Sequence, residues 1–129
     1  MIVDSSTLVA VLVREPGWER LFDRLAAEPA TGVGAPTLAE TGIVLAARLG
    51  VSGRTLLARF VQETNLVVVP LGDEHWGVAI DAFLRFGKGR HPARLNYGDC
   101  LTYAVARLAD EPLLCVGDDF SQTDLVLAA

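Results

Sequence analysis

The sequence is short of lysine and of positive charge. Lys88 is the one lysine among 129 residues, beside ten arginines, and the formal net charge is −5. A chain with this charge does not attract nucleic acid through its overall electrostatic field. A polyanionic substrate would therefore have to be held by a metal ion or by a local group of basic side chains.

The sequence also lacks the spacings that mark cysteine and histidine sites. Cys100 and Cys115 are too far apart for a zinc or redox motif, and His75 and His91 do not have zinc-protease spacing. There is no export signal at the N-terminus and no apolar run long enough to cross a bilayer. We therefore expect a cytoplasmic protein without membrane association.

Apolar residues, by contrast, are abundant. They make up 51% of the chain, and its mean hydropathy is positive. The length fits a single domain over residues 1–129 that buries a proper core. The apolar excess predicts exposed hydrophobic surface, which favours a protein partner or self-association.

Strand-like and helical segments alternate from end to end. Short apolar runs predict strands at 1–3, 31–35, 66–69 and 113–116, with an edge strand at 124–127. Of these, 66–69 is the clearest candidate for a buried strand. Helices are expected at 6–13, 16–28, 36–49, 52–64, from 73 onward, and at 99–110. Apolar strands joined by helices predict an α/β fold: a three-layer α/β/α sandwich around a mainly parallel sheet of four to five strands.

Acidic residues follow these apolar runs or open helices, at Asp4, Glu40, Asp99 and the pair Asp118–Asp119. The carboxyl ends of parallel strands share one edge of a sheet, where such folds bind ligands. Two carboxylates about 4 Å apart repel by roughly 4 kcal/mol at an effective dielectric near 20. A cluster would therefore take up protons or bind a hard divalent cation, and oxygen ligands favour Mg²⁺ or Mn²⁺ over Zn²⁺.

Each acid also has a purely structural explanation. Asp4 could cap a helix, and Glu40 could close a capping box with Thr37 unless the helix already begins at Pro36. The negative charge of Asp99 could interact favourably with the dipole at the start of its helix, and Asp118–Asp119 could form a turn. The interpretation as a site depends on the fold bringing these positions together.

Four segments resemble the motifs of PIN-domain ribonucleases of the VapC toxin type. They are residues 1–9, 35–40, 95–104, and 113–120 with Thr123–Asp124. The resemblance implies metal ligands at Asp4, Glu40, Asp99 and a fourth acid, for which Asp119 is favoured and Asp118 competes. It also implies that Ser6 supports the first acid.

The same resemblance implies an activity and partners. We expect a Mg²⁺-dependent endoribonuclease, with Mn²⁺ as a substitute, that leaves a 3′-hydroxyl and a 5′-phosphate. It would act as the toxin of a type II toxin–antitoxin system, form a homodimer and be neutralised by a VapB-type antitoxin. The antitoxin would dock on apolar residues of the first helices, namely Leu8, Val11, Leu12, Leu21, Phe22 and Leu25.

One stretch of the sequence is densely basic. It contains Arg85, Lys88, Arg90, His91 and Arg94. These side chains could grip RNA phosphates beside the acidic pocket, or could simply form a solvated loop.

Other classes fit the sequence less well. A haloacid-dehalogenase-like phosphatase needs an aspartate where this chain has Ser6, and a receiver domain needs a strand-end lysine. There is no glycine-rich phosphate loop. The alternative that remains is a non-catalytic metal- or RNA-binding module on the same scaffold.

Overall fold

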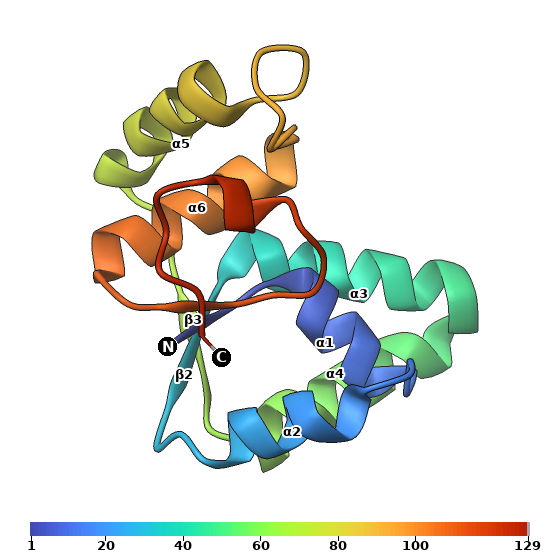
Figure 1. Cartoon of the computed structure of the whole chain (residues 1–129). Coiled ribbons are helices and arrows are strands. Elements are labelled where there is room, and N and C mark those ends of the chain that lie inside the picture. The colour runs from blue at the N-terminus through green and yellow to red at the C-terminus, as the bar shows by residue number, and fades with distance from the viewer. Residues whose placement is uncertain (129) are drawn as a thin grey trace.

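A computed structural model describes residues 1–128, and Ala129, the last residue of the expected domain, lies outside the described residues. A parallel sheet forms the centre of the fold (Figure 1). Its order is β3-β2-β1-β4, with bounds Ile2–Val3 for β1, Thr31–Gly34 for β2, Leu66–Val69 for β3 and Leu113–Leu114 for β4. All three pairings are parallel, which confirms the predicted α/β class.

The helices lie close to their predicted positions. They are α1 (Ser5–Leu12), α2 (Trp18–Ala26), α3 (Ala35–Leu49), α4 (Val51–Glu63), α5 (Asp73–Phe86) and α6 (Tyr97–Ala109), with a short 3₁₀ turn η1 at Phe120–Gln122. Gly50, with φ of 64°, ends α3 and allows α4 to begin at the next residue. None of the helices in residues 1–128 is long and apolar enough to span a membrane.

The strand residues alternate between the two helical layers. Ile2 and Leu113 pack with residues of α5 and α6, whereas Val3 packs with Leu8 of α1 on the other face. Leu114, next to Leu113, also packs on the α1 and α2 side. Both faces of the sheet are thus covered, as the predicted three-layer arrangement requires.

Three strand predictions need correction. The run 66–69 forms an edge strand rather than the most buried one, since Val67 and Val68 are 53% and 42% exposed. The strand predicted at 113–116 ends at Leu114. The expected edge strand at 124–127 is reduced to one bridge between Leu113 and Leu127. An apolar run predicts an extended chain, but its place in the sheet depends on distant segments.

Helices α3 and α4 approach each other closely at Gly53. A Cβ there would overlap the carbonyl of Leu45, whereas one at Gly77 of α5 would meet no atom within 4 Å. Both glycines are helical, so alanine is the better helix former at each position. The two sites differ in the space available for an added methyl group.

We therefore predict opposite effects of alanine at these two positions. Gly53→Ala should lower the free energy of unfolding by about 1–3 kcal/mol, because the added methyl overpacks the helix pair. Gly77→Ala should raise it by about 0.5–1 kcal/mol. Urea unfolding measures both, and equal stabilisation by the two substitutions would contradict the close approach at Gly53.

Candidate functional site

Asp4 is a buried carboxylate held by neutral donors. It directly follows β1 and caps α1, with Oδ2 accepting from the Ser6 N–H at 3.2 Å and from the Ser6 hydroxyl at 2.6 Å. Its Oδ1 accepts from the Thr102 hydroxyl of α6 at 3.0 Å. Asp4 is only 5% exposed. The capping explanation is therefore correct, but it leaves the carboxylate turned toward α6.

Ser6 connects two of the acidic segments. Besides donating to Asp4, its Oγ accepts from the Val116 N–H at 3.0 Å. Val116 follows β4 and precedes Asp118 and Asp119. One small hydroxyl thus ties the end of β1 to the chain that leaves β4.

Asp99 is oriented by the start of α6. Asn96 caps the helix, and its side chain accepts from the Asp99 N–H at 2.9 Å while the Asn96 N–H donates to Asp99 Oδ2 at 3.0 Å. Asn96 and Thr102 were not among the predicted site residues. Their spacing from Asp99 was the available signal. Asn96, three residues before Asp99, fits a capping box, and Thr102, three residues after it, lies on the same face of the helix.

Glu40 lies in the second turn of α3 and is not part of a capping box. The helix already begins at Ala35, with Gly34 as its cap and Pro36 in its first turn. The half-buried Glu40 side chain reaches α6, where a Cβ on Gly98 would lie 2.8 Å from Glu40 Oε2. The absence of a side chain at Gly98 therefore lets the carboxylate approach the first turn of α6.

Asp118 and Asp119 are both exposed, but they differ in their electrostatic influence. Asp119 comes just before η1, whose Phe120 is buried at 3% exposure. Of the two acids, it is Asp119 whose charge raises the pKa of Asp99 and of Cys115. The electrostatics therefore favour Asp119 as the fourth acid.

Asp99 feels the charge of the three other acids. Burial raises the pKa of Asp99 to about 6, against the lowering effect of the Asn96 N–H bond, and Asp4, Asp119 and Glu40 add to the rise. Burial also raises the pKa of the Cys115 thiol to about 11, with Asp4, Asp119 and Asp99 acting in the same direction. The edge of the sheet where these groups meet is a region of concentrated negative charge.

This donor set suits a hard divalent cation. Every candidate ligand is a carboxylate oxygen, the type that Mg²⁺ and Mn²⁺ prefer. Within residues 1–128, however, no three Asp, Glu, His or Cys side chains already form a group that could hold an ion. Coordination would therefore need the side chains to turn toward one another, and a cation would relieve their repulsion.

The basic stretch begins with Arg85 at the end of α5 and continues as a loop that leads into α6. Its base is closed by the Lys88 N–H donating to Leu95 O at 2.9 Å and the Leu95 N–H donating to Phe86 O at 3.0 Å. Lys88, Arg90 and Arg94 are exposed on this loop. Arg85 differs, because its guanidinium is paired with Asp124 at 3.2 Å. Arg85 is therefore the least available of the predicted phosphate contacts.

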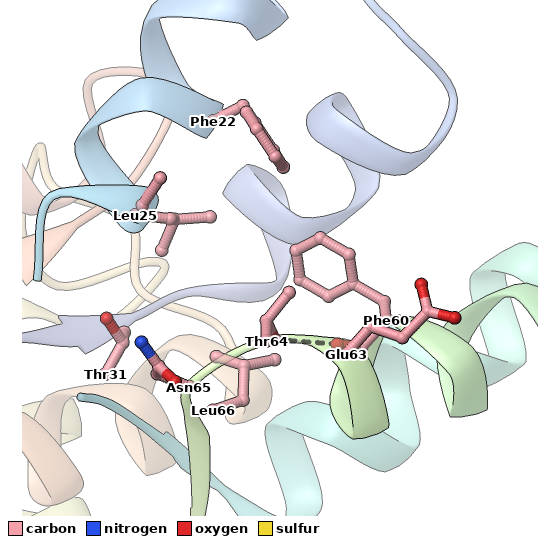
Figure 2. A pocket seen from close by; sticks show the side chains of 9 residues that line it. Phe22, Leu25, Thr31, Phe60, Glu63, Thr64, Asn65 and Leu66 are labelled. Atoms are coloured by element: carbon pink, nitrogen blue, oxygen red, sulfur yellow. Dashed lines mark hydrogen bonds between the residues drawn. The ribbon is translucent and has the colours of Figure 1, made fainter. Parts of the chain in front are cut away.

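The predicted apolar groove of the first helices needs correction. Leu8, Val11 and Leu21 are buried in the core, because α1 and the inner face of α2 pack against the sheet. An open groove lies instead between α2 and α4, where Phe22 is 40% exposed and Leu25 faces Phe60 (Figure 2). Thr31 and Leu66, which begin β2 and β3, line its floor. The groove thus lies at the amino ends of the strands, whereas the acids lie toward their carboxyl ends.

Comparison with known proteins places the chain in a family. The PIN-domain family model matches residues 1–125. A protein named ribonuclease VapC36 from Mycobacterium tuberculosis is 48% identical over 126 residues, which cover 97% of this chain and 91% of that protein. Ribonuclease VapC from Mycolicibacterium smegmatis is 38% identical over 125 residues, or 97% of each chain.

Solved structures share the fold at lower sequence identity. The crystal structure of M. tuberculosis VapC20, described as a sarcin-ricin loop cleaving toxin, matches with a TM-score of 0.79 and 21% identity over 98% of this chain and 97% of that one. VapBC2 from Rickettsia felis, bound to a promoter DNA fragment, matches with a TM-score of 0.79 and 13% identity over 98% and 96%. The chain belongs to the PIN-domain family, as one of its VapC-type members.

Proposed function

We propose that this protein is a Mg²⁺-dependent endoribonuclease that acts as the toxin of a type II toxin–antitoxin system. The observation that carries the proposal is the gathering of acids around the start of α6 at one edge of the sheet. Asp4 is bonded to α6 through Thr102, and Glu40 reaches Gly98 beside Asp99. Together with burial, the charges of Asp4, Asp119 and Glu40 raise the pKa of Asp99. The names of the VapC relatives support ribonuclease activity. The cytoplasm is the expected location, since the RNA substrate is found there.

The four acids have distinct roles in this proposal. Asp4 and Asp99 would be the central ligands, since Asp4 is fixed by Ser6 and Thr102 and Asp99 by Asn96. Glu40 and Asp119 would approach from α3 and from the segment after β4. A bound Mg²⁺ or Mn²⁺ would activate water and neutralise charge on the phosphodiester. The products would carry a 3′-hydroxyl and a 5′-phosphate.

Neutralising the acids tests this activity. Asp4→Asn and Glu40→Gln should each lower the rate of Mg²⁺-dependent RNA cleavage on the order of 100-fold or more, the scale for losing one group that stabilises a transition state. Asp23→Asn, at an exposed position on α2, is the matched control and should cleave normally.

Sequencing RNA 5′ ends after brief induction in cells would identify the target.

The alternative is a non-catalytic metal- or RNA-binding module. It predicts that folded wild-type protein binds Mn²⁺ or RNA without cleaving RNA. Cleavage that persists unchanged in both acid variants would also contradict the catalytic assignment. No particular contact in the structure favours this alternative over the nuclease.

Burial of Asp99, together with repulsion from the neighbouring acids, predicts a pH-dependent cost to stability. The raised pKa means that folding favours the neutral acid, so this contribution is full below about pH 4 and is lost as the pH rises through about 6. Asp99→Asn should remove the penalty and stabilise the metal-free protein at pH 7.5 by about 1 kcal/mol after solvent screening, a rise in Tm of about 3 °C. At pH 4 the gain should vanish.

Thermal unfolding with and without Mg²⁺ measures both parts of this prediction. Wild-type protein should gain stability from added Mg²⁺, and Asp99→Asn should gain less. Asp23→Asn serves again as the control and should show neither effect. Equal stability of wild type and Asp99→Asn at pH 7.5 would argue against an energetic cost of burying the Asp99 charge among the other acids.

RNA phosphates would contact the loop before α6. Lys88, Arg90 and Arg94 are exposed there, and the loop ends at Asn96, three residues before Asp99. The Arg90 guanidinium also lies 5.6 Å from the Phe83 ring centre, which restrains it near the end of α5. This placement would bring positive charge next to the acids in a chain of negative net charge.

A VapB-type antitoxin is the proposed protein partner, and the groove between α2 and α4 is its proposed docking site. The groove offers exposed Phe22 beside Leu25, Phe60 and Leu66, which suits the apolar face of a helix (Figure 2). The VapBC structure from R. felis and a toxin–antitoxin complex from Klebsiella pneumoniae share this fold and support a partner of this kind.

Substitutions on two separate apolar surfaces test this site. Phe22→Ala should weaken binding of a VapB-type antitoxin at least about 10-fold, since central aromatic contacts are commonly worth more than 1 kcal/mol. RNA cleavage should not change. Trp76→Ala, on α5, is the control at another exposed aromatic. Calorimetry that finds weaker binding only for Trp76→Ala would move the docking site to α5.

A homodimer is proposed on the other apolar surface. Trp76, Ile80, Phe83 and Leu84 of α5 are between 41% and 65% exposed, and Tyr97 of α6 is 81% exposed. A groove between α5 and α6 is lined by Trp76, Ile80, Phe83 and Tyr97 of this set. A second copy of the chain would cover these exposed apolar side chains.

A further inference from the structure

The segment that carries Asp119 has little regular structure of its own. It leaves β4 at Leu114 and contains only the three-residue turn η1 before the final bridge at Leu127. Asp119 is exposed within it, and its charge is repelled by Asp99. Something other than secondary structure must therefore hold Asp119 near the other acids.

Two attachments lie on either side of Asp119. On one side, the Val116 N–H donates to Ser6 Oγ at 3.0 Å. On the other side, Phe120 is buried among residues of α6 and β4. These contacts fix the start of the segment and one side chain next to Asp119.

A third attachment is a polar cluster around Asp124. The Tyr103 hydroxyl donates to Asp124 Oδ1 at 2.7 Å. Arg85 and Arg107 reach Oδ2 at 3.2 Å and 3.4 Å. Partial burial favours the neutral acid, but the Tyr103 bond and the two arginine charges outweigh it and lower the pKa of Asp124 below its ordinary value. Asp124 thus stays ionised and bonded at neutral pH.

Tyr103 links this cluster to the acids through α6. Its side chain is 2% exposed, and it lies one helical turn after Asp99. Thr102, its neighbour on the same helix, donates to Asp4. Helix α6 therefore carries Asp99, bonds Asp4 through Thr102, and bonds the segment that contains Asp119 through Tyr103.

We propose that Tyr103 and Asp124 are positioning residues that hold the segment 116–123 against α6, so that Asp119 completes the four-carboxylate site. The inference rests on the proposed metal site. Hydrogen bonds to a charged group outweigh the repulsion between Asp119 and Asp99, which is weakened by solvent because Asp119 is exposed. Without the cluster, that repulsion drives Asp119 away from Asp99.

Mn²⁺ affinity and hydrogen exchange test the proposal together. Tyr103→Phe and Asp124→Asn should each weaken Mn²⁺ binding to metal-stripped protein about 10-fold, the lower end of the effect of groups that orient metal ligands. In the same metal-free proteins, amides of 116–123 should exchange faster while those of α6 keep their wild-type rates.

A stability control separates positioning from general destabilisation. Leu57→Val removes one buried methylene on α4, away from the segment, and should lower Tm without changing Mn²⁺ affinity. If Tyr103→Phe and Asp124→Asn behave like Leu57→Val, with wild-type Mn²⁺ affinity, the positioning role is overturned.

A double-mutant cycle asks whether Asp124 acts through Asp119. In the Asp119→Asn background, Asp124→Asn should cause no further loss of Mn²⁺ affinity, because the ligand that it positions is already gone. Additive losses would overturn the inference while leaving the metal site intact. Wild-type protein that binds no Mn²⁺ would instead overturn the proposed function itself.

Discussion

Repulsion among carboxylates at one edge of a parallel sheet is the constraint on which this site depends. The fold does not relieve it with cations, because the contacts of Asp4 and Asp99 come from hydroxyl and backbone N–H groups. These neutral donors orient the acids and leave their charge in place. The result is a negatively charged edge, where burial and the charges of the neighbouring acids together raise the pKa of Asp99.

Helix α6 organises this edge. Asn96 fixes Asp99 at its start, Gly98 admits Glu40, and Thr102 reaches Asp4. Tyr103, one residue further, reaches Asp124. The first two turns of this one helix therefore contact every segment that carries an acid.

The remaining surface is divided by the same sheet. The acids gather toward the carboxyl ends of the strands, and the groove between α2 and α4 lies at the amino ends of the strands. The exposed apolar residues of α5 form a third surface on a separate helix. Such a separation would allow catalysis, partner docking and self-association to occupy different faces. It also accounts for the high apolar content seen in the sequence, since much of it is at the surface rather than in a larger core.

Local sequence was sufficient for part of the result. The apolar runs and helix starts predicted the α/β fold, because the periodicity of strands and helices is a property of neighbouring residues. The positions of the acids predicted that they would lie at one edge, because parallel strands all end at the same edge of a sheet. The sequence also contained a partial indication for Glu40, because Pro36 favoured an early start of its helix. Only the observed start at Ala35 excluded a capping box between Thr37 and Glu40.

Other features were decided by contacts between distant segments. The exposure of Val67 and Val68 depends on β3 being an edge strand, and the pairing of Arg85 depends on Asp124 arriving from the other end of the chain. The effect of the Asp119 charge on Asp99, like the lining of the α2–α4 groove, also depends on the packed structure. The sequence by itself determined which groups exist and along which elements they lie, and tertiary packing alone decided which of them meet, because burial and charge coupling depend on distances in space.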